Sequence, residues 1–244
     1  MTATVATRVW SDYPWLGWAL IGATAAAWSL ELRQARQRRW WFVYVFGIFV
    51  YTILRSYADE TFIPARTEYV IRLDEWLPGP EPVRWLQQRW FDRDNLDWLD
   101  YGAVAVHWSF FIMPHLAAVL VFLYRRPLFP RYATLVVGTM WLGLVLFYVL
   151  PTTPPWLASQ QGQLPGVERV MDFVGGNVNE STYNDFYASL AEPNSVAAMP
   201  SIHMAITFAM FLFALHYERK WLAGVLLAYS AVMAAALMYL GEHY

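Results

Sequence analysis

Long runs without a charged side chain dominate this sequence. Six stretches lack Asp, Glu, Lys and Arg: Tyr13–Leu30, Trp40–Leu54, Tyr101–Tyr124, Tyr132–Ser159, Asn194–Tyr217 and Trp221–Gly241. A helix needs about 20 apolar residues to cross a bilayer core of roughly 30 Å. Five stretches are long enough, and Trp40–Leu54 extends to that length if Arg55 lies at a wet edge or in a polar pocket. The pattern predicts an all-α integral membrane protein, a six-transmembrane-helix bundle.

The composition supports a membrane protein over a soluble helical bundle. A soluble bundle would show polar faces at helical spacing, and these stretches have none. Only 15% of the 244 residues are charged, against about 25% in an ordinary soluble domain. The first apolar stretch lacks a preceding basic region, so we do not expect a cleaved signal peptide. The chain has no cysteine, which excludes disulfides, thiolate nucleophiles and cysteine-ligated zinc.

Charges between the apolar stretches predict the orientation. The connections 31–39, 125–131 and 218–220 hold nine basic and two acidic side chains, whereas the remaining polar segments hold eight basic and 17 acidic. Basic loops stay in the cytoplasm. Both termini and the long segments Arg55–Asp100 and Pro151–Pro193 then lie on the non-cytoplasmic side. We expect a multi-pass protein of the cytoplasmic (plasma) membrane whose active site faces the periplasm or exterior.

The two outer segments carry further local signals. Pro82–Phe91 is rich in Trp and Arg and is predicted to lie flat as an interfacial helix. No helix can continue through Pro151–Trp156 (PTTPPW), because proline lacks the N–H that a helix needs. Asn179–Ser181 matches a glycosylation sequon, a short pattern that is common by chance.

The candidate chemistry rests on histidines. The chain has no glycine-rich phosphate loop, no G-x-S-x-G motif and no H-E-x-x-H motif. His216 falls at the cytoplasmic end of the fifth segment and is predicted to be structural. His115 falls near mid-membrane, where we expect a hydrogen bond between helices. The other three, His107, His203 and His243, fall near the outer surface.

His203 and His243 are predicted to meet at the outer ends of one helical hairpin. Pro200 fits the first turn of the fifth helix, whose free N–H groups favour an anion. Ser201 adds a hydroxyl there, and His203 adds a proton donor. The sixth segment returns His243 to the same face. Counting helical residues leaves the two histidines roughly 12 Å apart in depth, which side-chain direction and helix tilt would have to close.

The residues around these histidines resemble a known family. Ala198–His203 (AMPSIH) followed by Tyr239–Tyr244 (YLGEHY) resembles the type 2 phosphatidic acid phosphatase superfamily. The most similar branch contains fungal inositol phosphorylceramide synthase and bacterial relatives. Further features fit that branch: PTTPPW, Tyr51 with Arg55 four residues later, and His107. The resemblance implies one membrane domain over 1–244, with accessory N-terminal helices at 1–50 and a phosphatase/phosphotransferase-like core at 51–244.

The resemblance also implies roles for the two histidines. In this family a C-terminal histidine attacks phosphorus and forms a phosphohistidine, and an earlier histidine protonates the leaving oxygen. His243 is then the nucleophile and His203 the general acid. An Asp four residues after the nucleophile orients it, so we expect the natural chain to continue to position 247. Ala236 and Leu237 depart from the Ser-Arg that usually precedes the nucleophile.

A transferred phosphoryl group needs preorganised positive charge. No Lys-x6-Arg-Pro motif closes the fourth segment, and Arg125–Pro127 lies on the predicted cytoplasmic side. Arg55 is the expected phosphate ligand, with snorkelling to a headgroup as the alternative. Ser201 and His107 are further phosphate-binding candidates, although His107 also fits helix packing. Reserve cations from the outer loops are Arg66, Arg72 and Arg169.

The sequence therefore predicts a membrane phosphoryl-transfer enzyme that needs no cofactor or metal. Its substrate is expected to be a lipid or polyprenyl phosphate in the outer leaflet. Water as acceptor makes it a lipid phosphatase, whereas inositol or a sugar makes it an inositolphosphotransferase-type enzyme. The alternatives are a non-enzymatic transporter or scaffold, and a metal-dependent hydrolase with zinc on His203, His243 and a loop carboxylate. No nucleic-acid partner is expected, and the sequence does not predict the oligomeric state.

Overall fold

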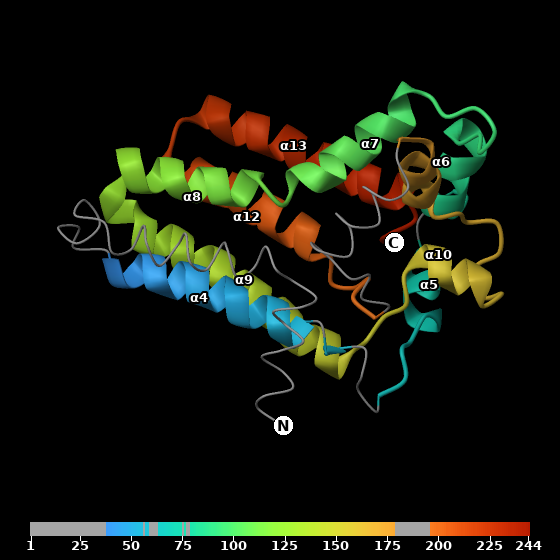
Figure 1. Cartoon of the computed structure of the whole chain (residues 1–244), viewed down its shortest axis with the longest axis horizontal. Helices are drawn as coiled ribbons and strands as arrows, with labels where there is room; N and C mark the ends of the chain where they lie inside the picture. The colour runs from blue at the N-terminus through green and yellow to red at the C-terminus, as the bar shows by residue number, and fades with distance from the viewer. Residues whose placement is uncertain (1–37, 56, 59–62, 75, 77–78, 179–195) are drawn as a thin grey trace.

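A computed structural model of the chain describes residues 38–55, 57–58, 63–74, 76, 79–178 and 196–244. The predicted helix Tyr13–Leu30 and the sequon at Asn179–Ser181 therefore lie outside the described residues. Within those residues the chain is all-helical, and its β-structure is limited to two isolated bridges. Figure 1 shows long helices side by side and several short helices gathered at one end of them.

The long helices follow the predicted apolar stretches. Their bounds are α4 (Arg38–Arg55), α7 (Trp98–Ser109), α8 (Met113–Tyr124), α9 (Phe129–Val149), α12 (Ile202–Tyr217) and α13 (Lys220–Tyr239). In the described part of the chain, the continuous helical stretch Arg126–Val149 and α13 are each long and apolar enough to cross a membrane. The bent pair α7–α8 counts as a third if it forms one span. The structure thus contains two or three candidate spans, and the predicted bundle of six stays a prediction.

The stretch Tyr101–Tyr124, predicted as one helix, is broken. Helices α7 and α8 meet at an angle of 45° across residues 110–112. Pro114 stands in the first turn of α8. Its ring clashes with the carbonyl four residues earlier, and it cannot donate the hydrogen bond that would continue α7. The break leaves His107 in the last turn of α7.

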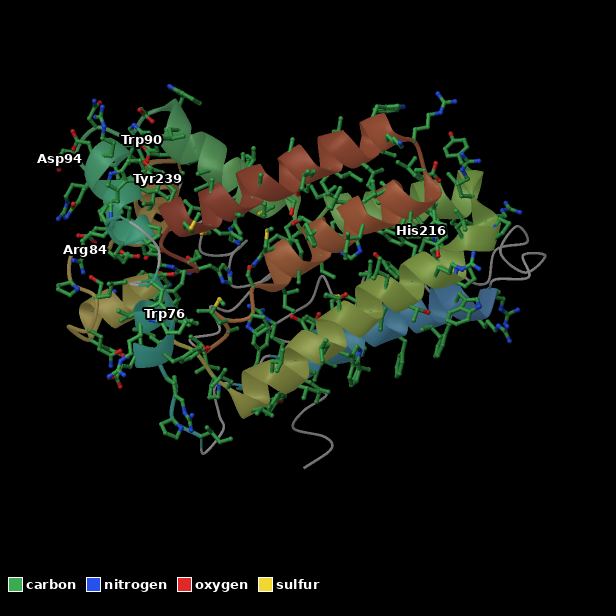
Figure 2. All side chains as sticks on the ribbon, turned by 180° about the vertical axis from the view of Figure 1, so that it is seen from behind. Trp76, Arg84, Trp90, Asp94, His216 and Tyr239 are labelled. Atoms are coloured by element: carbon green, nitrogen blue, oxygen red, sulfur yellow. The ribbon has the colours of Figure 1, made fainter. Side chains whose placement is uncertain are left out.

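The basic connections gather at one end of the bundle. Arg125 donates two hydrogen bonds to Glu218, of 3.0 and 3.2 Å, and so joins the α8–α9 and α12–α13 connections. The guanidinium of Arg131 lies 5.5 Å from the ring centroid of Tyr217. Figure 2 shows His216 at this end, with Trp90 and Asp94 at the other. Two of the three loops predicted to be cytoplasmic, 125–131 and 218–220, therefore share one end.

Short helices cover the opposite end. They are α5 (Glu68–Asp74), α6 (Pro82–Trp90) and α10 (Pro155–Gln160), and residues 170–178 are helical as well. The helix predicted over Pro82–Phe91 is confirmed as α6. It begins after Glu81, whose carboxylate accepts hydrogen bonds from the N–H groups of Val83 and Arg84.

Gln87 joins this cover to the end of α13. Its buried amide donates to the carbonyls of Glu168 (2.9 Å) and Tyr239 (2.8 Å). It also accepts a hydrogen bond of 2.8 Å from the N–H of Glu168. One side chain therefore satisfies three backbone groups and holds the outer layer against the place where α13 ends.

The central helices pack around a largely aromatic core. Trp41 of α4 contacts Phe122 of α8 and Phe129 of α9, with ring centroids 5.2 and 4.7 Å apart. The prediction of a hydrogen bond between helices for His115 is confirmed, because its Nδ1 lies 2.9 Å from the Tyr44 hydroxyl. The helices that carry the candidate site are thus fixed by packing as well as by backbone bonds.

Candidate active site

The proline-rich segment after α9 ends that helix, as predicted, and its residues 151–154 fix the strand-like residues before α12. Thr152 accepts a hydrogen bond of 3.1 Å from Ala198 and donates one of 2.8 Å to Val196. On the other side of this segment, the backbone N–H of Arg66 donates a hydrogen bond of 2.8 Å to the carbonyl of Pro151. Thr152 therefore forms parallel bridges with both Arg66 and Ala197. Three segments distant in sequence hold the Ala198 carbonyl in a defined place.

His203 projects from the first turn of α12. Ser201 is the N-cap, and its Oγ accepts a hydrogen bond of 3.3 Å from the N–H of Met204. The prediction that Pro200 lies inside the first turn was wrong, because the helix begins at Ile202 and Pro200 precedes the cap. Serine is a favoured N-cap residue, because its side-chain oxygen accepts a hydrogen bond from an N–H that the first turn leaves unpaired.

The predicted depth gap assumed that α13 continues as a helix to His243, and it does not. The helix ends at Tyr239, and Gly241 turns the chain back with a φ of +75°. Its N–H bonds the Met238 carbonyl, and the N–H of Glu242 bonds that of Leu237, at 3.0 and 3.1 Å.

This turn closes the gap between the two histidines. The ring centroids of His203 and His243 lie 5.5 Å apart. The position of Gly241 admits no side chain, because an added Cβ would lie 2.6 Å from the carbonyl oxygen of Glu168.

The tautomer of His243 follows from one contact. Its Nδ1 lies 2.6 Å from the carbonyl oxygen of Ala198. A carbonyl only accepts, so Nδ1 carries the hydrogen and Nε2 of the neutral ring carries the lone pair. The pKa of His243 is lowered to about 4, mainly by burial; the charge of Arg55 also lowers this pKa, whereas the Ala198 contact raises it. The ring is therefore neutral near pH 7.

His107 and His203 face each other. Their Nε2 atoms are 3.2 Å apart and their ring centroids 4.7 Å apart. Phe110 packs against His203 at 4.4 Å between centroids, and Phe111 lies 6.2 Å away. The Nδ1 atoms of both histidines are buried and make no hydrogen bond to the described residues.

A cavity of about 150 Å³ brings four of the five predicted site residues together: Arg55, His107, His203 and His243. Apolar side chains from α4, α9 and α12, such as Ile48, Met140 and Ile206, line the rest. Ser201 does not line this cavity. It borders a separate apolar groove of about 390 Å³ between α12 and α13, which His243 also lines.

Arg169, a reserve candidate in the sequence, lies beside this site. Its Nε donates to a Glu242 carboxylate oxygen at 2.9 Å, and both side chains are mostly buried. Its guanidinium also lies 4.7 Å from the ring centroid of Trp156, and Asp172 accepts a further bond of 3.3 Å. Trp156 and Glu242 line the cavity, so Arg169 fixes two of its wall residues.

Sequence reasoning missed two contributors. The Ala198 carbonyl is a backbone group, and no residue type signals its role. Gly241 had a signal, because a glycine directly before Glu242 and His243 at a predicted helix end is typical of a left-handed cap. Among the described residues, no group of three His, Asp or Glu side chains is arranged to hold a metal ion.

Comparison with known proteins identifies the family. Neither the curated proteins nor the solved structures include a match to this chain. The family model of the PAP2 superfamily matches residues 68–244, a region that includes the AMPSIH and YLGEHY segments. Because this match spans well over half of the sequence, the chain belongs to the PAP2 superfamily.

Proposed function

We propose that this protein is a phosphoryl-transfer enzyme that acts on a lipid or polyprenyl phosphate through a phosphohistidine intermediate. Family membership supports a phosphatase- or phosphotransferase-type activity in a membrane protein. One contact carries the mechanism. The bond from His243 Nδ1 to the Ala198 carbonyl leaves Nε2 with the lone pair that a nucleophile needs.

The chemistry proceeds in two displacements. Nε2 of His243 attacks phosphorus, and the bond from phosphorus to the leaving oxygen breaks while His203 gives that oxygen a proton. Water, or a hydroxyl of inositol or a sugar, then attacks the phosphohistidine. His203 takes up the proton of the attacking group, and the phosphorus–nitrogen bond breaks. Arg55 neutralises the charge on the phosphoryl oxygens.

The substrate class is supported by the apolar groove between α12 and α13. Met199, Met204, Phe208 and Leu237 line it, and His243 borders both this groove and the cavity. An alkyl or polyprenyl chain in the groove would bring its phosphate to the nucleophile. The relation to the inositol phosphorylceramide synthase branch rests on Tyr51, Arg55 and Trp156, which all line the cavity.

The topology we propose has six transmembrane helices and both termini on the non-cytoplasmic side. The basic connections joined by Arg125 and Glu218 lie at the opposite end of the α12–α13 hairpin from His203 and His243. If basic loops are cytoplasmic, the site faces the periplasm or exterior of the plasma membrane. Reagents that cannot cross the membrane should then reach the site residues only from outside.

Purified protein with a labelled lipid phosphate tests the proposal. We expect phosphate release, or transfer to added inositol or sugar, and a labelled phosphohistidine that His243→Gln abolishes. His203→Ala should lower turnover by about 10²–10⁴-fold. His216→Gln, at the opposite end, is the control. Unchanged turnover in both site variants would overturn the mechanism. An activity lost in EDTA and restored by zinc would favour a metal-dependent hydrolase instead.

A further inference from the structure

The contact between His107 and His203 has a constrained chemistry. Two imidazole nitrogens at 3.2 Å form a hydrogen bond only if one carries a hydrogen and the other a lone pair. The partners come from different helices, since His107 lies in the last turn of α7 and His203 in the first turn of α12. The break before Pro114 ends α7 here, so the helices are placed for this contact.

The surroundings of His203 indicate that it is the donor in this hydrogen bond and that His107 is the acceptor. A general acid of this kind acts from its cationic form, and His203 is buried against Phe110 and Phe111. An imidazolium in an apolar site is costly unless its hydrogens are bonded. A neutral His107 offers an acceptor at Nε2, and a hydrogen bond from a cation is roughly twice as strong as a neutral one.

We propose that His107 is a positioning residue, which accepts the Nε2 hydrogen of His203 and leaves Nδ1 of His203 to protonate the leaving oxygen. This inference rests on the proposed function of His203. It also replaces the two roles that the sequence suggested for His107, phosphate binding and helix packing.

The proton balance closes over both displacements. Cationic His203 starts with hydrogens on both nitrogens. As the phosphorus–oxygen bond breaks, its electron pair stays on the leaving oxygen, which receives the Nδ1 hydrogen. His203 is then neutral and still donates from Nε2 to His107. In the second displacement Nδ1 takes the proton of the attacking hydroxyl. His107 gains and loses nothing, which is why we name it a positioning residue.

Two substrates whose leaving groups differ in their need for a proton distinguish this role of His107 from helix packing. Hexadecyl phosphate releases an alkoxide that needs a proton, whereas p-nitrophenyl phosphate releases a stable phenolate. We expect His107→Leu to lower kcat on hexadecyl phosphate by about 10²-fold or more. The rate on p-nitrophenyl phosphate should stay within about threefold. A residue that only packs α7 against α12 would lower both rates by the same factor, and that result would overturn the inference.

Two further comparisons complete the test. His107→Gln places an amide oxygen near the position of Nε2 and should restore part of the alkyl activity, whereas the shorter His107→Asn should not. Both are polar, so they decide the question if His107→Leu does not fold. Adding His107→Leu to His203→Ala should cost nothing more. His216→Leu is the matched control. If the His203 and His243 variants lose activity while those of His107 do not, only this inference fails; if none loses activity, the proposed function fails.

Discussion

The rings of His203 and His243 lie 5.5 Å apart at an angle of 67°, although 39 residues stand between them in the sequence. Two features produce this. The α12–α13 hairpin returns the chain to the same end of the bundle, and the turn at Gly241 directs the last residues inward. The proposed nucleophile, His243, is therefore positioned by the turn that follows α13 and not by a place on the helix itself.

We predict that Gly241→Ala lowers activity far more than stability. An alanine there meets the carbonyl of Glu168 at 2.6 Å and takes up a left-handed backbone, at a cost of about 1–2 kcal/mol before any clash. The chain relieves the clash by moving, and His243 moves with it. Turnover should fall by about 10²-fold, since small misplacements of reacting groups have effects of that size.

Gly162→Ala is the matched control for this change. Gly162 has a similar φ of +76°, but an added Cβ would meet nothing within 4 Å. The Gly162→Ala variant should therefore have the same free-energy cost of a left-handed alanine, and His243 should stay in place. Thermal unfolding and steady-state kinetics measured on both variants separate the two effects. Equal losses of turnover in the two variants would contradict the positioning role of the Gly241 turn.

Arg55→Gln should weaken substrate binding and shift the pH profile. Loss of a charge-assisted bond to phosphate, worth about 1.5–3 kcal/mol, corresponds to about 10–10²-fold in kcat/KM. The charge of Arg55 also lowers the pKa of His243, so removing it raises that pKa. The nucleophile must be neutral. The acidic fall in kcat/KM, expected near pH 4 for His243 in the native protein, should therefore move to higher pH.

The control for Arg55 is Arg131→Gln, which removes an arginine near the start of α9, at the opposite end of the bundle. Its kcat/KM and acidic limb should match those of the native protein. An Arg55→Gln variant with a lower kcat/KM but an unmoved acidic limb would separate phosphate binding from the electrostatic effect on His243. An unchanged kcat/KM would contradict the role of Arg55 in binding the phosphate.

Some of these features follow from local sequence and others depend on how distant segments meet. Apolar length predicted the courses of α9 and α13, and proline chemistry predicted that no helix continues through PTTPPW, because both depend on local physics. The AMPSIH and YLGEHY motifs pointed to His203 and His243. The sequence did not reveal the break near Pro114, because the apolar residues continue without interruption on both sides of the break and so predict one helix.

The partners of the histidines were beyond sequence reasoning for a different reason. The contacts from His243 to Ala198 and from His203 to His107 span 45 and 96 residues. Each depends on where separate segments meet, and the first involves a backbone oxygen common to every residue type. His107 was predicted to bind phosphate or to pack between helices, because its distance to His203 could not be inferred from spacing.

Gln87→Leu should destabilise the outer layer and, through it, the site. The substitution leaves two carbonyls and one N–H without the partners that Gln87 supplies. Unsatisfied buried polar groups cost about 1–3 kcal/mol each, partly recovered where water enters. We expect a clear fall in Tm and an earlier loss of activity on heating. Limited proteolysis that cleaves between α6 and α7 sooner would locate the change, and an unaltered Tm would contradict the role of Gln87.

Asp74→Asn should stabilise the protein, and more so as the pH rises. Burial raises the pKa of Asp74 to about 6, with a further contribution from Glu81, and one carboxylate oxygen has no hydrogen-bond partner among the described residues. The ordinary pKa of an aspartate is about 3.9. Between about pH 4 and 6 the folded state therefore holds more protons than the unfolded state, and stability falls as the pH rises through that window.

The asparagine is neutral throughout, so it removes this dependence. The Tm advantage of Asp74→Asn should be small near pH 4 and reach its full size above pH 6, measured by tryptophan fluorescence in detergent. Glu68→Gln removes one negative charge from the exposed side of α5, where Glu68 pairs with Arg72, and serves as the control. A Tm advantage that is the same at pH 4 and pH 7 would mean that Asp74 acts through packing, because only a carboxylate that ionises on unfolding makes stability depend on pH in this direction.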